Sequence, residues 1–535
     1  MTTYARRLGI FSATMAVMGG IIGSGVFLGP EIVAARVGTA ALTLVAWIVG
    51  GIIALAGALC FGELGARRPR AGGGYVYLRE AFGSLPAFLY GWALLLVIAT
   101  GATAAVAVTF ASYTVALLGM PLQATLPLAI GAIALLCGVN YVGVKPAAIS
   151  QNVFTLLKLA AVVALIVAGL SFKSSTDLSR PLPPSTASSL GAALVPVLFA
   201  YGGWQQTNFI AEEIIEPERN LPRALLAGVA GVVVVYLLAN LAYLRVLGVA
   251  GLAHSSAPAA GVMARVLGPP GQRLISAGIS VSTFGFLNLV ILVTPRVFQA
   301  MAADGVFLDR LARLHPIYRT PTGAIVFMGA WSIVLALSGT YAQLLDYVVF
   351  GDWIFFGLTV ASLFIYRIRD LNRVPPLHVV ERGSGGEARV PGYPWTPALF
   401  VLAAAYVVVS SIVANPKNAL IGTGLLALGV PVYRVARRRK PRRDPPAARA
   451  TVRGARCRAI PPAGMAAAPA TRARAPGAVR AAVDARLGVV SRARRGDRGG
   501  FAVDPDPRRG RDDARGRGAA GDVVRPTPKP ATTPD

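Results

Sequence analysis

Two charged residues stand inside stretches of sequence that are otherwise apolar enough to lie in a membrane. Lys158 lies within QNVFTLLKLAAVVALIV, and Asp352 lies within YVVFGDWIFFGLTV. A charge at membrane depth costs roughly 2.5–3.5 kcal/mol on insertion scales unless it has a partner, so such residues mark ion or substrate pathways. Both are candidates for binding or coupling chemistry, although Lys158 could also be a lysine that extends to a membrane surface.

Two glycine-rich stretches could supply binding chemistry from the backbone itself. They read MGGIIGSGVFLGP (18–30) and FAYGGWQQTNF (199–209). A break in a helix leaves free N–H groups, which attract a carboxylate, and free carbonyls, which attract an ammonium group. An α-amino acid carries both groups. The alternative use of such glycines is close helix packing, for which Gly19 and Gly23 have the right spacing.

The residue types that other chemistries need are sparse. The histidines and cysteines are isolated and have no metal-ligand or redox spacing: His254, His315, His378, Cys60, Cys137 and Cys457. The apolar stretches contain no histidine and no paired carboxylates that could form a catalytic centre. We therefore expect a protein that is not an enzyme and that uses no metal ion and no cofactor.

The elements that must position these residues are membrane-spanning helices. The 535 residues are 55% hydrophobic and only 14% charged, which is too apolar for a soluble protein. Apolar runs of about 20 residues predict about twelve spans, each long enough to cross a bilayer core of about 30 Å. Their centres lie near residues 22, 53, 98, 132, 159, 201, 235, 286, 330, 355, 404 and 425. The sequence predicts an all-α polytopic membrane protein.

The two glycine-rich stretches fall in the first and sixth predicted spans. Interruptions at matching places in two halves point to a transporter built from inverted repeats. The repeats would cover about 9–170 and 188–366, with two extra helices at about 393–436. A transporter domain is thus expected over residues 1–436.

Arginine is concentrated in alternate predicted loops, which places both termini in the cytoplasm and the protein in the inner (cytoplasmic) membrane. Residues 437–535 are rich in Arg, Ala, Gly and Pro, which predicts a disordered basic cytoplasmic tail. Such a tail would contact lipid headgroups rather than nucleic acid. The alternative is an out-of-frame extension with no function.

Several separated motifs, in order, carry a resemblance to a known family. They are GIIGSGVF (20–27), GELGARRPRAGGGYVYLREAFG (62–83), FAYGGWQQTNFIAEEI (199–214) and TPRVFQAMAADGVFLDRLARLHPIYRTP (294–321). Together they resemble the amino acid permeases of the amino acid, polyamine and organocation superfamily, nearest to the L-type amino acid transporters and their bacterial relatives. The resemblance implies a leucine-transporter-like fold, a 5+5 inverted repeat with discontinuous helices 1 and 6.

The resemblance also implies roles for particular residues. The backbone at Ser24 and Gly25 would hold the substrate carboxylate. The carbonyls of Ile21, Phe199 and Gly202 would hold the α-ammonium group. Phe199 would also act as a gate over the substrate, where the alternative is an ordinary core aromatic.

Further residues are expected around the same cavity. Trp204 and Gln205 would border it, and the small apolar residues of ATGATAAVAV (99–108) would line it. In the family, a lysine like Lys158 replaces a Na⁺ ion between the first, fifth and eighth spans. Asp352 departs from the uncharged residue of many relatives, so it would either line the pathway or cap a helix break at Gly351.

The inner ends of two spans carry acidic residues beside cytoplasmic arginines. Glu63, Glu212 and Glu213 are expected to form an ion-paired inner gate rather than to do chemistry.

The function expected from these features is sodium-independent transport of amino acids by alternating access, with exchange of neutral amino acids favoured. The alternatives are a proton-coupled symporter, a cationic amino acid or polyamine antiporter, and a membrane-embedded sensor. The expected partners are an amino acid substrate and membrane lipids, without nucleic acid. No obligate ancillary subunit is expected, and a homo-oligomer is left open.

Overall fold

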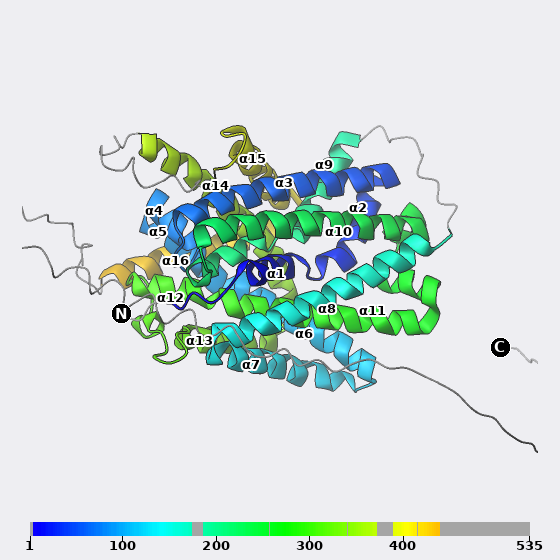
Figure 1. Ribbon diagram of the computed structural model, residues 1–535, viewed down its shortest axis with the longest axis horizontal. Coiled ribbons are helices and arrows are strands. Elements are labelled where there is room, and N and C mark those ends of the chain that lie inside the picture. The colour runs from blue at the N-terminus through cyan, green and yellow to red at the C-terminus, as the bar shows by residue number, and fades with distance from the viewer. Residues whose placement is uncertain are drawn as a thin grey trace, which may run out of the picture. The chain divides into compact units, whose positions relative to one another are not determined.

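The computed structural model describes residues 4–173, 186–255, 257–339, 341–371, 389–414 and 416–438, and these residues fold into helices joined by short loops (Figure 1). The helices are α1 Ile10–Ile21, α2 Gly25–Val37, α3 Ala40–Arg67, α4 Gly74–Phe82, α5 Ser84–Ala93, α6 Ala99–Leu118, α7 Thr125–Val142, α8 Val144–Ser171, α9 Thr186–Ala200, α10 Pro217–Ala253, α11 Pro258–Val293, α12 Pro295–Ala303, α13 Thr322–Ser338, α14 Tyr341–Leu371, α15 Trp395–Ala414 and α16 Pro416–Arg438. Shorter turns are the π-helical η1 Leu94–Ile98 and the 3₁₀ elements η2 Leu122–Ala124, η3 Trp204–Glu213 and η4 Asp309–Ala312. The sequence-predicted tail lies outside the described residues from residue 439 on.

The helices agree with the predicted all-α membrane protein. Within the described residues, nine helical segments are long and apolar enough to cross a membrane. Two further apolar helices are shorter, α1 with 12 residues and α13 with 17. At 1.5 Å per residue α1 is only about 18 Å long, so it cannot cross a bilayer core alone.

The first predicted span is discontinuous, as expected. Helix α1 ends at Ile21 and α2 begins at Gly25. Between them the Gly23 N–H donates to the carbonyl of Ile21 at 2.9 Å, which closes a tight turn instead of continuing the helix. The glycines therefore break the span in its middle.

The sixth predicted span is also broken. Helix α9 ends at Ala200, and the chain resumes in η3 at Trp204. Gly203 has a φ of 110°, a backbone conformation that favours glycine. Its N–H donates to the side chain of Gln205 at 2.9 Å. After the break the chain continues as the 3₁₀ element η3.

The two breaks lie against each other. A Cβ atom at Gly203 would lie 2.1 Å from the carbonyl oxygen of Gly20, and one at Gly20 would lie 2.8 Å from the carbonyl oxygen of Gly203. Gly19 faces α8, where its Cβ would lie 2.2 Å from Gln151 Nε2. Gly19 and Gly20 therefore serve close packing, which was one of the two expectations for this stretch.

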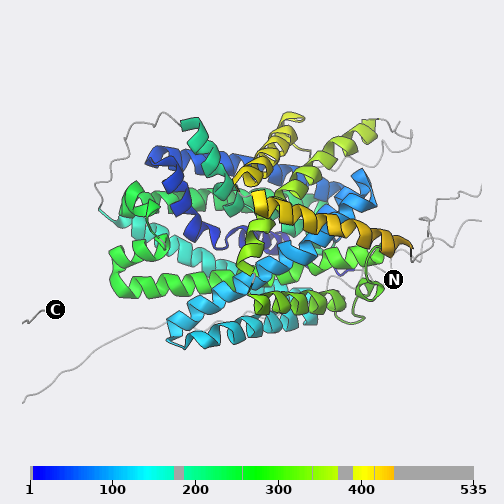
Figure 2. The ribbon, with the colours of Figure 1, turned by 180° about the vertical axis from the view of Figure 1, so that it is seen from behind.

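Long helices hold the breaks in place. Helix α10 packs against α3, α1, α2 and α8, and α11 packs against α8 and α6. Helix α14 packs against α15 and α6, and Figure 2 shows α16 beside α5 on the far side of the view in Figure 1. The buried residues of these contacts form one continuous core.

Candidate functional site

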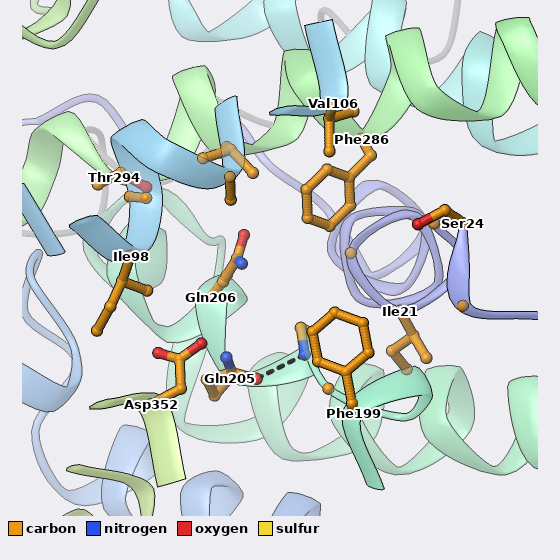
Figure 3. Close-up of a pocket in the computed structure, with 18 of the residues that line it drawn as sticks. Ile21, Ser24, Ile98, Val106, Phe199, Gln205, Gln206, Phe286, Thr294 and Asp352 are labelled. Carbon is orange, nitrogen blue, oxygen red and sulfur yellow. Dashed lines mark hydrogen bonds between the residues drawn. The ribbon is translucent and has the colours of Figure 1, made fainter. Parts of the chain in front are cut away.

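A cavity lies where the two helix breaks meet (Figure 3). Its wall comes from the first break, from η1 and the start of α6, from the second break with η3, and from α11 and α14. The sequence-predicted residues that line it are Ile21, Ser24, Gly25, Phe199, Gly202, Gln205 and Asp352. The fold thus gathers residues from spans far apart in the sequence around one space.

One end of the cavity is formed by the start of α2. The first N–H groups of a helix have no partner within the helix, so this end presents free donors at Ser24 and Gly25. Ser24 makes no capping hydrogen bond to α2, and its hydroxyl group points toward the cavity in Figure 3. Gly25 also serves packing, because its Cβ would lie 2.9 Å from the Cα of Ala200.

Backbone carbonyls lie near the same end. The Ile21 carbonyl already accepts a hydrogen bond from the Tyr236 hydroxyl at 2.9 Å and another from the Gly23 N–H. The Phe199 carbonyl accepts the Gly202 N–H at 3.0 Å. An ammonium group bound there would therefore share these oxygens with the protein's own donors.

Two aromatic side chains face the middle of the cavity. The side chains of Phe199 from α9 and Phe286 from α11 both project into it (Figure 3). Phe199 is 45% exposed, so its ring does not seal the cavity in this conformation. The small apolar wall expected from the third span is present, since Ala99, Ala102, Ala105 and Val106 line the cavity.

Lys158 is completely buried and lies behind the first break, outside the cavity wall. Its ammonium group donates to the carbonyls of Gly19 at 3.0 Å and Ile22 at 2.7 Å. Ser282 of α11 also donates to the Ile22 carbonyl, at 3.3 Å. The lysine of α8 thus meets the broken first span and α11 at one point, and it does not extend to a membrane surface.

Polar side chains gather at the end of the cavity opposite Ser24. Asp352 from α14, Gln205 and Gln206 from η3, and Thr294 after α11 line this end (Figure 3). Within the described residues, no cluster of three histidine, cysteine or acidic side chains could hold a metal ion. The cavity therefore offers backbone donors and acceptors at one end and a carboxylate at the other.

This arrangement can be compared with known proteins. The amino acid permease family matches residues 8–433. The chain belongs to the amino acid permease family. A serine/threonine exchanger of Bacillus subtilis is 32% identical over 439 residues, 81% of this chain and 98% of the relative.

Two mammalian relatives of this permease are similar to the same degree. The b(0,+)-type amino acid transporter 1 of Mus musculus is 32% identical over 426 residues, 78% of this chain and 84% of the relative. The large neutral amino acids transporter small subunit 2 of Mus musculus is 31% identical over 445 residues, 80% of each chain.

One expectation about the permease does not agree with the structure, and one of the two alternatives for Asp352 is excluded. Trp204 does not line the cavity among the described residues. It is 3% exposed and packs edge-on against Phe61 and Phe400. Helix α14 runs through Gly351 without a break, so Asp352 does not cap one.

Other residues of the permease cavity were missed by the sequence analysis. They include Tyr90, Thr109, Gln206, Phe286 and Thr294. Gln206 follows Gln205 directly in η3, beside the second break, and both line the cavity. Phe286 and Thr294 lie in apolar runs, where the sequence does not indicate which face of the helix would line a cavity.

A buried ion pair and backbone hydrogen bonds join the N-terminal segment to η3 and α12 of the permease. Glu213 and Arg296 form a buried pair, with Arg296 Nε 2.8 Å from Glu213 Oε1. The carbonyl of Glu213 accepts the N–H groups of Arg7 and Leu8, at 2.9 and 3.0 Å. Glu213 therefore links η3 both to the N-terminal segment and to α12.

A second group of ion pairs joins α3, α14 and the segment before α15. Glu63 is 1% exposed and pairs with Arg67 at 2.7 Å and with Arg367 at 2.5 Å. The same carboxylate accepts the Val390 N–H at 2.6 Å. Glu212 accepts the Ala71 N–H at 3.2 Å. The acidic residues expected beside cytoplasmic arginines are thus paired or hydrogen-bonded.

Proposed function

We propose that this permease is a sodium-independent amino acid exchanger that works by alternating access. The observation that carries the proposal is the contact between the two helix breaks, at Gly20 and Gly203, beside one cavity. Each break presents backbone groups to the cavity, and together their dipoles match the two charges of an α-amino acid. The relatives that are named exchangers or amino acid transporters support the same class.

In this proposal the substrate lies between the breaks. Its carboxylate accepts hydrogen bonds from the N–H groups at Ser24 and Gly25, as anions do at helix N-termini. Its α-ammonium group donates to the carbonyls of Ile21, Phe199 and Gly202. Phe199 then turns over the substrate and closes the cavity, because an apolar ring excludes water from these hydrogen bonds.

Lys158 takes the place of a coupling ion in this scheme. Its ammonium group neutralises the carbonyl end of α1 through Gly19 and Ile22. A fixed positive charge at that position does the electrostatic work of a bound Na⁺. Transport then needs no sodium, and the concentration gradient of the amino acid on the other side of the membrane drives it.

The conformation corresponds to one state of the cycle. On the side of the protein where the amino terminus lies, the ion pairs Glu213–Arg296 and Glu63–Arg367 hold helices together and close the path to the cavity. The side chain of Phe199 is exposed at the cavity. With the amino terminus in the cytoplasm, as the arginine distribution indicates, we assign this conformation to a state closed toward the cytoplasm. The opposite state requires these ion pairs to separate.

Several wider features belong to the same proposal. Residues 1–436 form the transporter domain, with inverted repeats at about 9–170 and 188–366. The protein lies in the cytoplasmic membrane with both termini inside and acts as a transporter rather than as an enzyme. It works without an ancillary subunit, although one relative is named a small subunit.

The experiment is counterflow in liposomes containing the purified protein. Labelled amino acid is offered outside to liposomes that are empty or loaded with unlabelled amino acid, with sodium or with choline outside. The proposal predicts uptake that depends on internal amino acid and is unchanged by choline. Uptake that requires sodium, or that proceeds equally well into empty liposomes, would contradict it.

A further inference from the structure

The carboxyl group of Asp352 lies on the cavity wall without a partner from the protein. No described residue pairs with it or donates a hydrogen bond to it. It projects from α14 into the end of the cavity away from Ser24 (Figure 3). A carboxylate removed from water without a partner is costly, so burial alone favours the protonated carboxyl, and a cation that binds beside it would stabilise the ionised form.

A second group at the same end also has no partner. The side-chain oxygen of Gln206 is buried and accepts no hydrogen bond within the described part of the chain. Gln206 and Asp352 both reach this end of the cavity in Figure 3. The neighbouring Gln205 differs, since its side-chain oxygen accepts the Gly203 N–H at 2.9 Å. Asp352 and Gln206 thus each present a hydrogen-bond acceptor to the cavity that has no donor from the described part of the protein.

The charge of the wall leads to the same conclusion. Asp352 is the one charged side chain among the described residues that line the cavity. The nearest buried cation discussed above, Lys158, is bound to Gly19 and Ile22 outside the wall. A neutral amino acid carries one positive and one negative charge, so it brings no additional positive charge with which the Asp352 carboxylate could pair. A substrate with one further positive charge would compensate it.

We propose that this end of the cavity is a subsite for a cationic side chain, so that the permease exchanges amino acids ending in an ammonium or guanidinium group. Asp352 pairs with the charge and Gln206 accepts one of its hydrogen bonds. The aliphatic part of such a side chain lies along Val106, which lines the cavity between its ends, and along Ile98 beside Asp352 (Figure 3). The inference rests on the proposed exchange function and replaces the neutral preference expected from the sequence.

The test compares lysine with norleucine, which has the same carbon chain but no terminal ammonium group. Binding to the purified protein in detergent is measured by thermal shift, and exchange is measured by counterflow in liposomes. The wild-type protein is expected to bind lysine at least about tenfold more tightly than norleucine, as charge-assisted hydrogen bonds in a closed site allow. Equal binding, or rejection of lysine, would overturn the subsite.

Two variants separate the subsite from the rest of the site. Asp352→Asn keeps the size of the side chain and is expected to weaken lysine binding about tenfold or more while leaving norleucine binding unchanged or improved. Gln206→Met should weaken lysine binding by a smaller factor. Glu218→Gln, an exposed carboxylate at the start of α10, is the matched control and should change neither.

The outcomes distinguish this inference from the function on which it rests. Exchange of norleucine without lysine, or an equal loss of both ligands in Asp352→Asn, would overturn the cationic subsite and leave the exchanger intact. Selective lysine binding without any exchange would support the subsite and overturn the exchanger. Selective exchange of lysine that Asp352→Asn abolishes would support both.

Discussion

The carbonyl oxygen of Gly20 lies 2.1 Å from the point where Gly203 would carry a Cβ atom. No side chain fits between these residues, so the broken first span and the broken sixth span touch backbone to backbone. This contact places the free peptide groups of both breaks at the same cavity. The glycines are therefore needed for two reasons, to interrupt the helices and to let the interruptions meet.

Gly203→Ala should remove this contact. An added Cβ must displace the Gly20 carbonyl, and alanine also disfavours the φ of 110°. We expect a loss of stability of about 1–3 kcal/mol and the loss of exchange. Thermal unfolding in detergent and counterflow measure the two effects. The control is Gly138→Ala on α7, where a Cβ would meet nothing within 4 Å, and it should behave like the wild type. If Gly203→Ala also had the stability and exchange rate of the wild type, the argument would be wrong.

Lys158→Met should strongly reduce exchange while leaving membrane insertion intact. Methionine keeps the apolar stem but leaves the carbonyls of Gly19 and Ile22 without the ammonium group. A loss of roughly 10- to 100-fold in exchange rate is expected for a charge-assisted contact of this kind. Counterflow at equal protein content per liposome checks it. Near-normal exchange would show that the lysine does not replace a coupling ion.

Glu213→Gln should destabilise the protein, because it leaves Arg296 buried without its counter-charge. Both side chains are at most 1% exposed, and removing one partner of a buried pair costs about 3–5 kcal/mol. Thermal unfolding measures the loss. Adding Arg296→Met to Glu213→Gln should restore part of the stability. If the double variant were no more stable than Glu213→Gln alone, the pair would not be the cause.

Glu63→Gln should favour the state that is open to the cytoplasm. The change weakens the contacts of Glu63 with Arg67 and Arg367, which join α3 to α14. Thr294 is 1% exposed, lines the cavity and stands two residues before Arg296, which pairs with Glu213. In a cysteine-free background, Thr294→Cys should react severalfold faster with a thiol reagent when Glu63→Gln is present. An unchanged labelling rate would mean that the ion pairs do not hold the closed state.

The sequence predicted the breaks and the buried lysine because both depend on local composition. Glycines in an apolar run, and a lone lysine such as Lys158, are costly in lipid unless the structure uses them. The sequence did not predict that Trp204 would turn away from the cavity. That orientation depends on the 3₁₀ winding of η3 and on the space that Gly57 leaves for the indole ring, where a Cβ would lie 2.6 Å from it.

The cavity wall itself could be predicted only in part. Ser24, Gly25 and Phe199 lie within motifs, whereas Phe286 and Thr294 lie on α11 and after it, in an ordinary apolar run. Which face of α11 meets the breaks depends on its packing against α8 and α6, and that is a tertiary property. The same holds for Asp352, whose lack of a partner is visible only in three dimensions.

The most direct test of the central claim is a structure of the protein determined with an amino acid bound. The account predicts the carboxylate of the ligand within hydrogen-bond distance of the N–H groups at Ser24 and Gly25, and its α-ammonium group at the carbonyls of Ile21, Phe199 and Gly202. A ligand bound elsewhere, or a continuous helix through either break, would contradict it.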